Sequence, residues 1–211
     1  MPYNYLGSTI NPDSLNHNDL LYAYSNGYFP LGEEDGTIGW YEHNPRGIIE
    51  ISDKKADFRI SRSLQQVINK KQFEIKVDND FYSVIKLCSE VHRPTWITRE
   101  IIYLYLELHQ KGFAHSIEAY LDNQLAGGLY GVAFRSTFFG ESMFHLKNNA
   151  SKVCVVKLYE ILRNNNFQLF DIQMITPIFK SFGAINISKV DYRKRLHKAL
   201  AINCKFDVAT T

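Results

Sequence analysis

The amino-acid sequence predicts an α+β fold, in which a mixed sheet is flanked by helices and preceded by a small N-terminal α/β domain. Three observations indicate this class. Residues 114–141 form successive runs in which apolar and polar side chains alternate, as in paired strands, whereas residues 150–163 carry apolar side chains at helical spacing. Residues 167–173 are a short apolar run that an acid and an amide interrupt, which is typical of a strand.

The first 46 residues account for the small N-terminal domain. We expect an irregular start up to about residue 18, because polar residues and turn signals fill this segment. A helix is predicted over 17–25, with Asn18 or Asp19 near its start, and a strand over 37–41. The sequence Asn44-Pro45-Arg46 breaks the chain, so we expect domains at 1–46 and 47–211.

The larger domain is predicted to combine strands and helices. Extended segments are expected over 48–51, 56–60, 73–77, 114–121, 125–134, 137–141 and 167–173, and helices over 62–71, 81–91, 99–111, 150–163 and 189–200. The residues that suit the N-cap positions are Ser61 or Ser63, Thr98, Asn149 and Ser188. The order of antiparallel strands, helix, strand and helix suits an acyltransferase fold of the general N-acetyltransferase type.

Composition and charge are those of an ordinary soluble protein. Of the 211 residues, 45% are apolar and 22% are charged, and the formal net charge is +2. No window approaches the ~18 consecutive apolar residues of a membrane span, and the N-terminus lacks the pattern of a signal peptide. We therefore expect a cytoplasmic protein without membrane contact. The three cysteines and seven histidines show no metal-binding spacing, so no metal site is expected.

Two local basic clusters stand out against this low net charge. Lys70 and Lys71 end one predicted helix, and Arg193 and Lys194 lie in the predicted C-terminal helix. The C-terminal cluster also contains Lys189, Arg195 and Lys198. Both clusters fit contacts to RNA phosphates, and both fit solvated helix faces equally well.

Asp171 and Gln173 are the most suggestive polar pair in the sequence. Residues two apart in a strand share a face, so both side chains would point the same way, while Phe170 and Ile172 would point into a core. A carboxylate beside a carboxamide on one strand face fits a functional site. The same pattern also fits an exposed polar strand face, and the spacing alone does not decide between the two.

Several common active-site motifs do not fit this sequence. The run Gly-Glu-Ser-Met-Phe at 140–144 is not a nucleophile elbow, because its last residue is not glycine. The run Gln-Leu-Ala-Gly-Gly-Leu at 124–129 lacks the final small residue of a coenzyme A pyrophosphate loop and falls inside a predicted hairpin. There is no P-loop and no dinucleotide fingerprint. We therefore expect no cofactor.

A series of short motifs occurs in a fixed order along the chain. They are Trp-Ile-Thr-Arg at 96–99, Gly-Phe-Ala-His-Ser-Ile-Glu at 112–118, Gly-Gly-Leu-Tyr-Gly at 127–131, Phe-Gly-Glu-Ser-Met-Phe at 139–144, Asn-Ala-Ser-Lys at 149–152 and Asp-Ile-Gln at 171–173. From about Ala23 to about Tyr192, this series closely resembles the leucyl/phenylalanyl-tRNA–protein transferase family. The resemblance implies an N-acetyltransferase-like larger domain after a small N-terminal domain.

The resemblance also implies an activity. Enzymes of this family transfer Leu, and also Phe or Met, from aminoacyl-tRNA to the N-terminal Lys or Arg of acceptor proteins, which marks the acceptors for N-degron degradation. The expected partners are therefore aminoacyl-tRNA and such acceptor proteins, and we expect a monomer. Two alternatives remain: an acyl-CoA-dependent N-acyltransferase, which the broken pyrophosphate loop disfavours, and a non-catalytic tRNA- or degron-binding module.

The family positions further imply roles for individual residues. Asp171 is expected to hold the incoming ammonium, and Gln173 to fix the amine or the carbonyl, either as a base or only by positioning. The substrate-binding residues that the resemblance implies are Glu141, Leu129, Phe138, Leu158, Trp96, Tyr24 and Tyr105. Among them, the apolar residues would hold the donor side chain, and Trp96 would stack on the terminal adenine of tRNA.

The chain departs from the family pattern in four places. It lacks the usual Gly-Gly-Asp-Leu element near the N-terminus, and Leu31 replaces a Trp that commonly follows Phe-Pro. The usual Trp-x-Pro-x-Pro-Arg reads Tyr-Glu-His-Asn-Pro-Arg at 41–46, and Ile178 replaces a His. These differences affect the expected adenosine contacts and acceptor choice more than the type of reaction.

Overall fold

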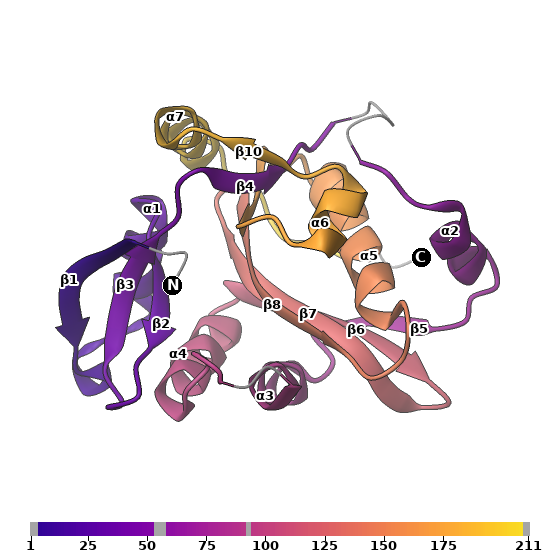
Figure 1. Cartoon of the computed structure of the whole chain (residues 1–211), viewed down its shortest axis with the longest axis horizontal. Coiled ribbons are helices and arrows are strands. Elements are labelled where there is room, and N and C mark those ends of the chain that lie inside the picture. The colour runs from indigo at the N-terminus through magenta and orange to yellow at the C-terminus, as the bar shows by residue number, and fades with distance from the viewer. Residues whose placement is uncertain (1–3, 53–57, 92–93, 209–211) are drawn as a thin grey trace.

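The computed structural model describes residues 4–52, 58–91 and 94–208. The N-terminal part is a three-stranded antiparallel sheet in the order β1-β3-β2, with helix α1 beside it (Figure 1). Its elements are β1 (Asn4–Ile10), the short helix η1 (Pro12–Ser14), α1 (His17–Ser25), β2 (Phe29–Gly32) and β3 (Ile38–Glu42). The small N-terminal unit and its predicted helix and strand are thus present.

One expectation about this segment was wrong. Residues 4–10, which we expected to be irregular, form β1 and pair with β3. The polar residues of this segment do not show a strand pattern. The strand forms because it pairs with β3, which is distant in the sequence. The cap of α1 is Asn16, whose side chain accepts from the Asn18 N–H while Asp19 accepts from the Asn16 N–H, which makes a capping box.

The larger sheet has seven strands in the order β10-β4-β9-β8-β7-β6-β5. The strands are β4 (Arg46–Ile49), β5 (Glu74–Val77), β6 (Ala114–Leu121), β7 (Gln124–Phe134), β8 (Thr137–His145), β9 (Leu169–Gln173) and β10 (Ile185–Ile187). Neighbouring strands are antiparallel except β8 and β9, which are parallel. This mixed sheet confirms the α+β class. The chain leaves β3 and enters β4 at Asn44-Pro45, where the sequence predicted a break.

Helices cover both faces of the large sheet (Figure 1). They are α2 (Arg62–Asn69), α3 (Phe81–Val91), α4 (Arg99–Gln110), α5 (Ala150–Asn164), α6 (Pro177–Phe182) and α7 (Lys189–Leu200). Helices α3 and α4 pack on one face and α5 on the other, which divides the apolar core into two clusters. Tyr130 and Phe139 belong to the first cluster, and Leu129, Phe138 and Phe170 to the second.

Most predicted helices lie within two residues of the observed ones, and Ser61, Thr98 and Ser188 cap them as expected. Asn149 occupies the N-cap position of α5, but its backbone is left-handed and its side chain makes no capping bond. The sequence did not predict α6 and β10. The cap Thr176 and the following Pro177 were the available signals for α6. Of the extended segment expected over 56–60, residues 56 and 57 lie outside the described residues, and residues 58–60 do not form a strand.

The described residues contain neither a membrane span nor a metal-binding cluster. Across 4–52, 58–91 and 94–208, none of the helices combines the length and the apolar character that crossing a membrane requires. The same residues contain no group of three or more His, Cys, Asp or Glu side chains arranged to hold a metal ion.

Candidate active site

The candidate site lies where the parallel strands β8 and β9 stop pairing. Their pairs run from Thr137 and Leu169 to Phe139 and Asp171. Glu141 and Gln173 each follow two residues later, so both lie past the end of this ladder. Their side chains meet there: Nε2 of Gln173 donates to Oε2 of Glu141 at 3.4 Å. The strand order therefore brings a carboxyl and a carboxamide together at an open sheet end.

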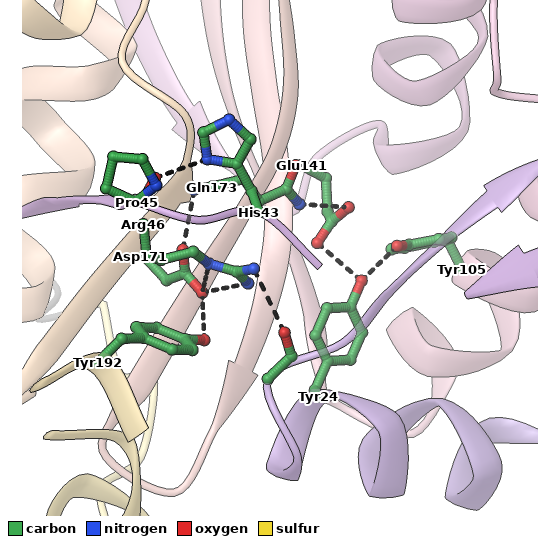
Figure 2. A network of polar contacts seen from close by, with 10 residues as sticks. Tyr24, His43, Pro45, Arg46, Tyr105, Glu141, Asp171, Gln173 and Tyr192 are labelled. Atoms are coloured by element: carbon green, nitrogen blue, oxygen red, sulfur yellow. Dashed lines mark hydrogen bonds and ion pairs between the residues drawn. The ribbon is translucent and has the colours of Figure 1, made fainter. Parts of the chain in front are cut away.

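Asp171 is buried beside this opening and has no exposed surface. Arg46 donates from Nε to Oδ1 at 2.9 Å and from Nη2 to Oδ2 at 2.7 Å. The Tyr192 hydroxyl donates to Oδ2 at 2.6 Å, and the Gln173 N–H donates to Oδ1 at 2.8 Å (Figure 2). Both carboxylate oxygens are therefore occupied by protein donors. Direct binding of an incoming ammonium, the role expected from the sequence, does not fit this arrangement.

Gln173 ends β9 in an unusual backbone conformation. Its φ is +59°, in the left-handed region that residues other than glycine seldom adopt, at a cost of roughly 1–3 kcal/mol. Phe170 and Ile172 point into the core beneath α5, as predicted. In this backbone conformation the Gln173 N–H donates a hydrogen bond to the Asp171 carboxylate. The side chain of Gln173 reaches Glu141. Asp171 and Gln173 are thus neighbours, but only Gln173 reaches the opening.

The pKa of the Glu141 carboxyl group is raised. Burial raises its pKa to about 7, because the charged form loses water that the protein does not replace. Hydrogen bonds from Tyr24 and Tyr105 oppose this rise. The Tyr24 hydroxyl donates to Oε1 of Glu141 at 2.7 Å and also shares a short hydrogen bond with the Tyr105 hydroxyl. Glu141 is thereby poised to change charge near neutral pH.

Glu141 and Gln173 line a cavity of about 570 Å³. Three more of the expected substrate-binding residues line it, namely Trp96, Leu129 and Leu158. The other lining residues are Pro94, Thr95, Ile97, Tyr130, Gly140, Ser142, Met143, Phe170, Ile172, Met174, Thr176, Pro177, Ile178 and Phe179. Their side chains are largely apolar, and Glu141 is the one acidic residue among the lining residues that the structure describes.

Four of the expected catalytic and substrate-binding residues do not line this cavity. They are Asp171, Phe138, Tyr24 and Tyr105. Phe138 is fully buried and packs edge-to-face on Phe170 at 5.8 Å between ring centroids, so it supports the wall from behind. Tyr24 and Tyr105 connect to the cavity through Glu141. The spacing of apolar residues in a strand does not reveal which side of a wall each one occupies.

Sequence reasoning missed two residues that the structure places at Asp171. Arg46 was named as part of a chain break and as the end of the family segment at 41–46, but it was given no role at the site. Tyr192 was given no role within the basic C-terminal helix. The partners of Asp171 are 125 and 21 positions away along the chain, so no local pattern links them. An arginine directly before a predicted buried strand was the one available signal, because a buried charge requires a partner.

The two basic clusters lie in different settings. Lys70 and Lys71 are exposed at the end of α2. Arg193 and Lys194 are exposed on α7, directly after Tyr192. Acidic residues partly balance the α7 cluster, because Lys189 and Arg193 lie 2.5 and 4.0 Å from Glu42.

The geometry indicates a class of enzyme. An apolar cavity that ends in a carboxyl group of neutral pKa and a carboxamide can hold an acyl group and an attacking amine together. Such a site suits acyl transfer to an amine.

Comparison with known proteins identifies the family. The family model described as leucyl/phenylalanyl-tRNA protein transferase matches residues 53–197, and the model of its N-terminal domain matches residues 13–42. A relative from Herpetosiphon aurantiacus, named leucyl/phenylalanyl-tRNA–protein transferase, is 44% identical over 89% of this chain and 95% of its own. One of the same name from Gloeothece citriformis is 43% identical over 88% and 95%. The chain belongs to the leucyl/phenylalanyl-tRNA–protein transferase family, which confirms the resemblance and places it among the aminoacyltransferases.

A more distant likeness exists among solved structures. The structure of L-PGS from Bacillus licheniformis aligns with 14% identity and a TM-score of 0.41, over 86% of this chain and 62% of that one. A score this low supports no argument about fold type or activity.

Proposed function

We propose that the protein transfers Leu, and also Phe or Met, from aminoacyl-tRNA to the N-terminal Lys or Arg of acceptor proteins. The product would carry a new peptide bond and be marked for N-degron degradation. The observation that carries the proposal is the contact between Gln173 and Glu141 at the wall of the cavity, in a chain whose relatives are named as transferases of this kind. An acyl-CoA enzyme is not favoured by these relatives.

The reaction requires the N-terminal nitrogen of the acceptor to attack the ester carbonyl carbon of the aminoacyl-tRNA. A C–N bond forms, and the C–O bond to the ribose breaks. The ammonium first loses one proton, and the attacking nitrogen loses a second, which the ribose oxygen gains as it leaves. An N-terminal ammonium has a pKa of ~8, so Glu141 with its pKa of about 7 is well matched to receive the first proton.

Gln173 is proposed to position the amine and not to act as a base, because a carboxamide has almost no basicity. Its Nε2 already donates to Glu141, so an amine bound beside both groups would lie next to the proton acceptor. Holding amine and ester together can lower the barrier by ~7–11 kcal/mol. Asp171 is proposed as a positioning residue, because its oxygens are taken by Arg46, Tyr192 and Gln173.

The donor side chain is proposed to occupy the apolar part of the cavity. Leu129 and Leu158 line it, and Phe138 supports it through Phe170. Trp96 lines the same cavity and is proposed to stack on the terminal adenine, a contact worth ~1–3 kcal/mol. Lys70, Lys71, Arg193 and Lys194 are proposed to contact tRNA phosphates.

Several broader features are proposed with this function. We infer an N-acetyltransferase-type larger domain at 47–211 after a small domain at 1–46. The protein is proposed to act as a cytoplasmic monomer without a cofactor. Ile178, which replaces the family His, lines the cavity and is proposed to alter acceptor choice.

The direct test is transfer of labelled Leu from charged tRNA to a model protein with N-terminal Arg. The matched controls are the same protein with an acetylated N-terminus and acetyl-CoA as donor. The proposal predicts label in the acceptor only with charged tRNA and a free N-terminus. Transfer from acetyl-CoA instead would establish an acyl-CoA enzyme, and binding of charged tRNA without transfer would establish a non-catalytic module.

A further inference from the structure

Arg46 is a buried charge at the centre of the polar network. It begins β4, is 1% exposed and forms a two-point ion pair with Asp171 (Figure 2). Its guanidinium lies between two rings, with 5.1 Å to the centroid of Phe29 and 4.6 Å to that of Tyr192. Nη1 donates to the Gly27 carbonyl at 3.3 Å. Arg46 therefore contacts β2, the end of α1, β9 and α7 at once.

The ion pair fixes the orientation of the Asp171 carboxylate. A planar guanidinium that donates from two nitrogens to two carboxylate oxygens leaves the carboxylate little rotational freedom. The Tyr192 hydroxyl donates to Oδ2 as well, so Oδ1 faces the remaining partner, the Gln173 N–H. Lysine has the same charge but lacks this fork.

Oδ1 of Asp171 is the point where Arg46 and Gln173 meet. It accepts from Arg46 Nε at 2.9 Å and from the Gln173 N–H at 2.8 Å. Gln173 has a left-handed backbone that its residue type disfavours, and such a conformation persists only when its surroundings hold it. The conformation directs the carboxamide to Glu141.

We propose that Arg46 is a positioning residue for the transfer reaction, which acts through Asp171 to hold the backbone of Gln173 and so its carboxamide beside Glu141. This inference rests on the proposed function. Arg46 lies outside the residues that line the cavity, and its hydrogen bonds towards the reacting groups run through Asp171. A misplacement of about 1 Å by a residue remote from the chemistry can lower a rate ~100-fold.

The test compares Arg46→Lys and Tyr192→Phe with the wild type, each alone and combined with Gln173→Ala. Tyr41→Phe is the matched control, because Tyr41 is a buried tyrosine that donates to the Glu33 carboxylate at 2.5 Å. The measurements are kcat and KM for aminoacyl-tRNA, together with the melting temperature. We expect Arg46→Lys to lower kcat by roughly 30- to 100-fold with KM within about threefold. Tyr192→Phe should lower kcat by roughly 3- to 10-fold, and Tyr41→Phe should leave it unchanged.

The double variants separate positioning from general loss of structure. If Arg46 acts through Gln173, Arg46→Lys should change kcat by less than about threefold once Gln173 is alanine. Equal losses with and without Gln173, or a folded Arg46→Lys protein of wild-type kcat, would overturn the inference. If Arg46→Lys does not fold, the loss of kcat in Tyr192→Phe is compared with and without the Gln173 side chain instead.

A readout without catalysis keeps the two proposals apart. The backbone N–H resonance of Gln173 should move in Arg46→Lys and Tyr192→Phe and stay in place in Tyr41→Phe, because only the first two alter the Asp171 carboxylate. If the wild type transfers no Leu, the proposed function fails, and an unmoved Gln173 resonance then rejects the positioning role independently.

Discussion

Two carboxyl groups, Asp171 fully buried and Glu141 partly buried, lie close together in this protein and differ in their partners. Asp171 faces a guanidinium, and its oxygens also accept from a hydroxyl and a backbone N–H. Glu141 receives hydrogen bonds from neutral groups, the Tyr24 hydroxyl and the Gln173 amide. Burial with a cation fixes a charge in place, whereas burial among neutral donors leaves the charge costly. The first group suits a scaffold and the second suits proton transfer.

The largest expected effect comes from breaking the paired carboxylate. Asp171→Ala would leave the Arg46 guanidinium buried without its partner, which costs roughly 3–5 kcal/mol of stability. The melting temperature should fall by roughly 10 °C, and transfer activity should be lost. Thermal unfolding followed by circular dichroism measures the fall. Asp35→Ala, at an exposed aspartate, is the control and should change little, whereas equal melting temperatures for Asp171→Ala and wild type would refute the role assigned to the ion pair.

Replacing Glu141, which has no cation bonded to its carboxyl group in the described contacts, should raise stability and not lower it. The pKa of Glu141 is raised in the folded protein to about 7 from its usual 4.5, so the folded state binds more protons than the unfolded state between these values. Stability from this group is present below pH ~4.5 and is lost as the pH rises through about 7. Glu141→Gln removes the loss and should be more stable than wild type by up to about 3 kcal/mol at pH 8, but not at pH 4.5. Urea unfolding at both pH values tests this, and a pH-independent difference would contradict it.

Substitution of a residue in the cavity wall should have a smaller effect, which is a change in the preference between donor amino acids. Leu158 lines the cavity, whereas Leu162, one turn further along α5, is equally buried and does not. Leu158→Ala should admit the β-branched side chain of Ile and shift the product ratio from leucyl- and isoleucyl-tRNA in competition by roughly 10-fold. Leu162→Ala should lose comparable stability, ~2–5 kcal/mol, and keep the wild-type ratio. The same ratio in both variants would place the donor side chain elsewhere.

The smallest effect concerns the basic clusters at the surface. Lys70 and Lys71 lie far from the acids that balance α7, so reversing both charges should weaken tRNA binding and lower its salt slope by ~1 for each phosphate that the protein no longer neutralises. Reversal of Arg193 and Lys194 should do less, because Glu42 already offsets part of that charge. Titrations at several salt concentrations test this order, with Lys111→Glu as the control. Slopes that neither reversal changes would exclude both clusters from the tRNA path.

The same contrast explains what the sequence could predict. Helix α3 matches its predicted residues because apolar spacing over eleven residues is a local signal. Two-residue spacing likewise drew attention to Asp171 and Gln173 at the end of one strand, but it did not decide between a functional site and an exposed polar face. Strand β1 was missed because pairing with β3, and not its own residues, makes it a strand. The ion pair of Asp171 was missed because its partner Arg46 lies 125 positions away along the chain.

The most direct test of the central claim is the pH dependence of kcat for Leu transfer in wild type and in Glu141→Gln. A proton acceptor works only when it is deprotonated, so the wild-type rate should rise with pH through about 7 and then level off. Glu141→Gln should be slower, and its rise should move towards ~8, where the amine loses its proton without help. An identical rise in both proteins would contradict the claim that Glu141 accepts the proton.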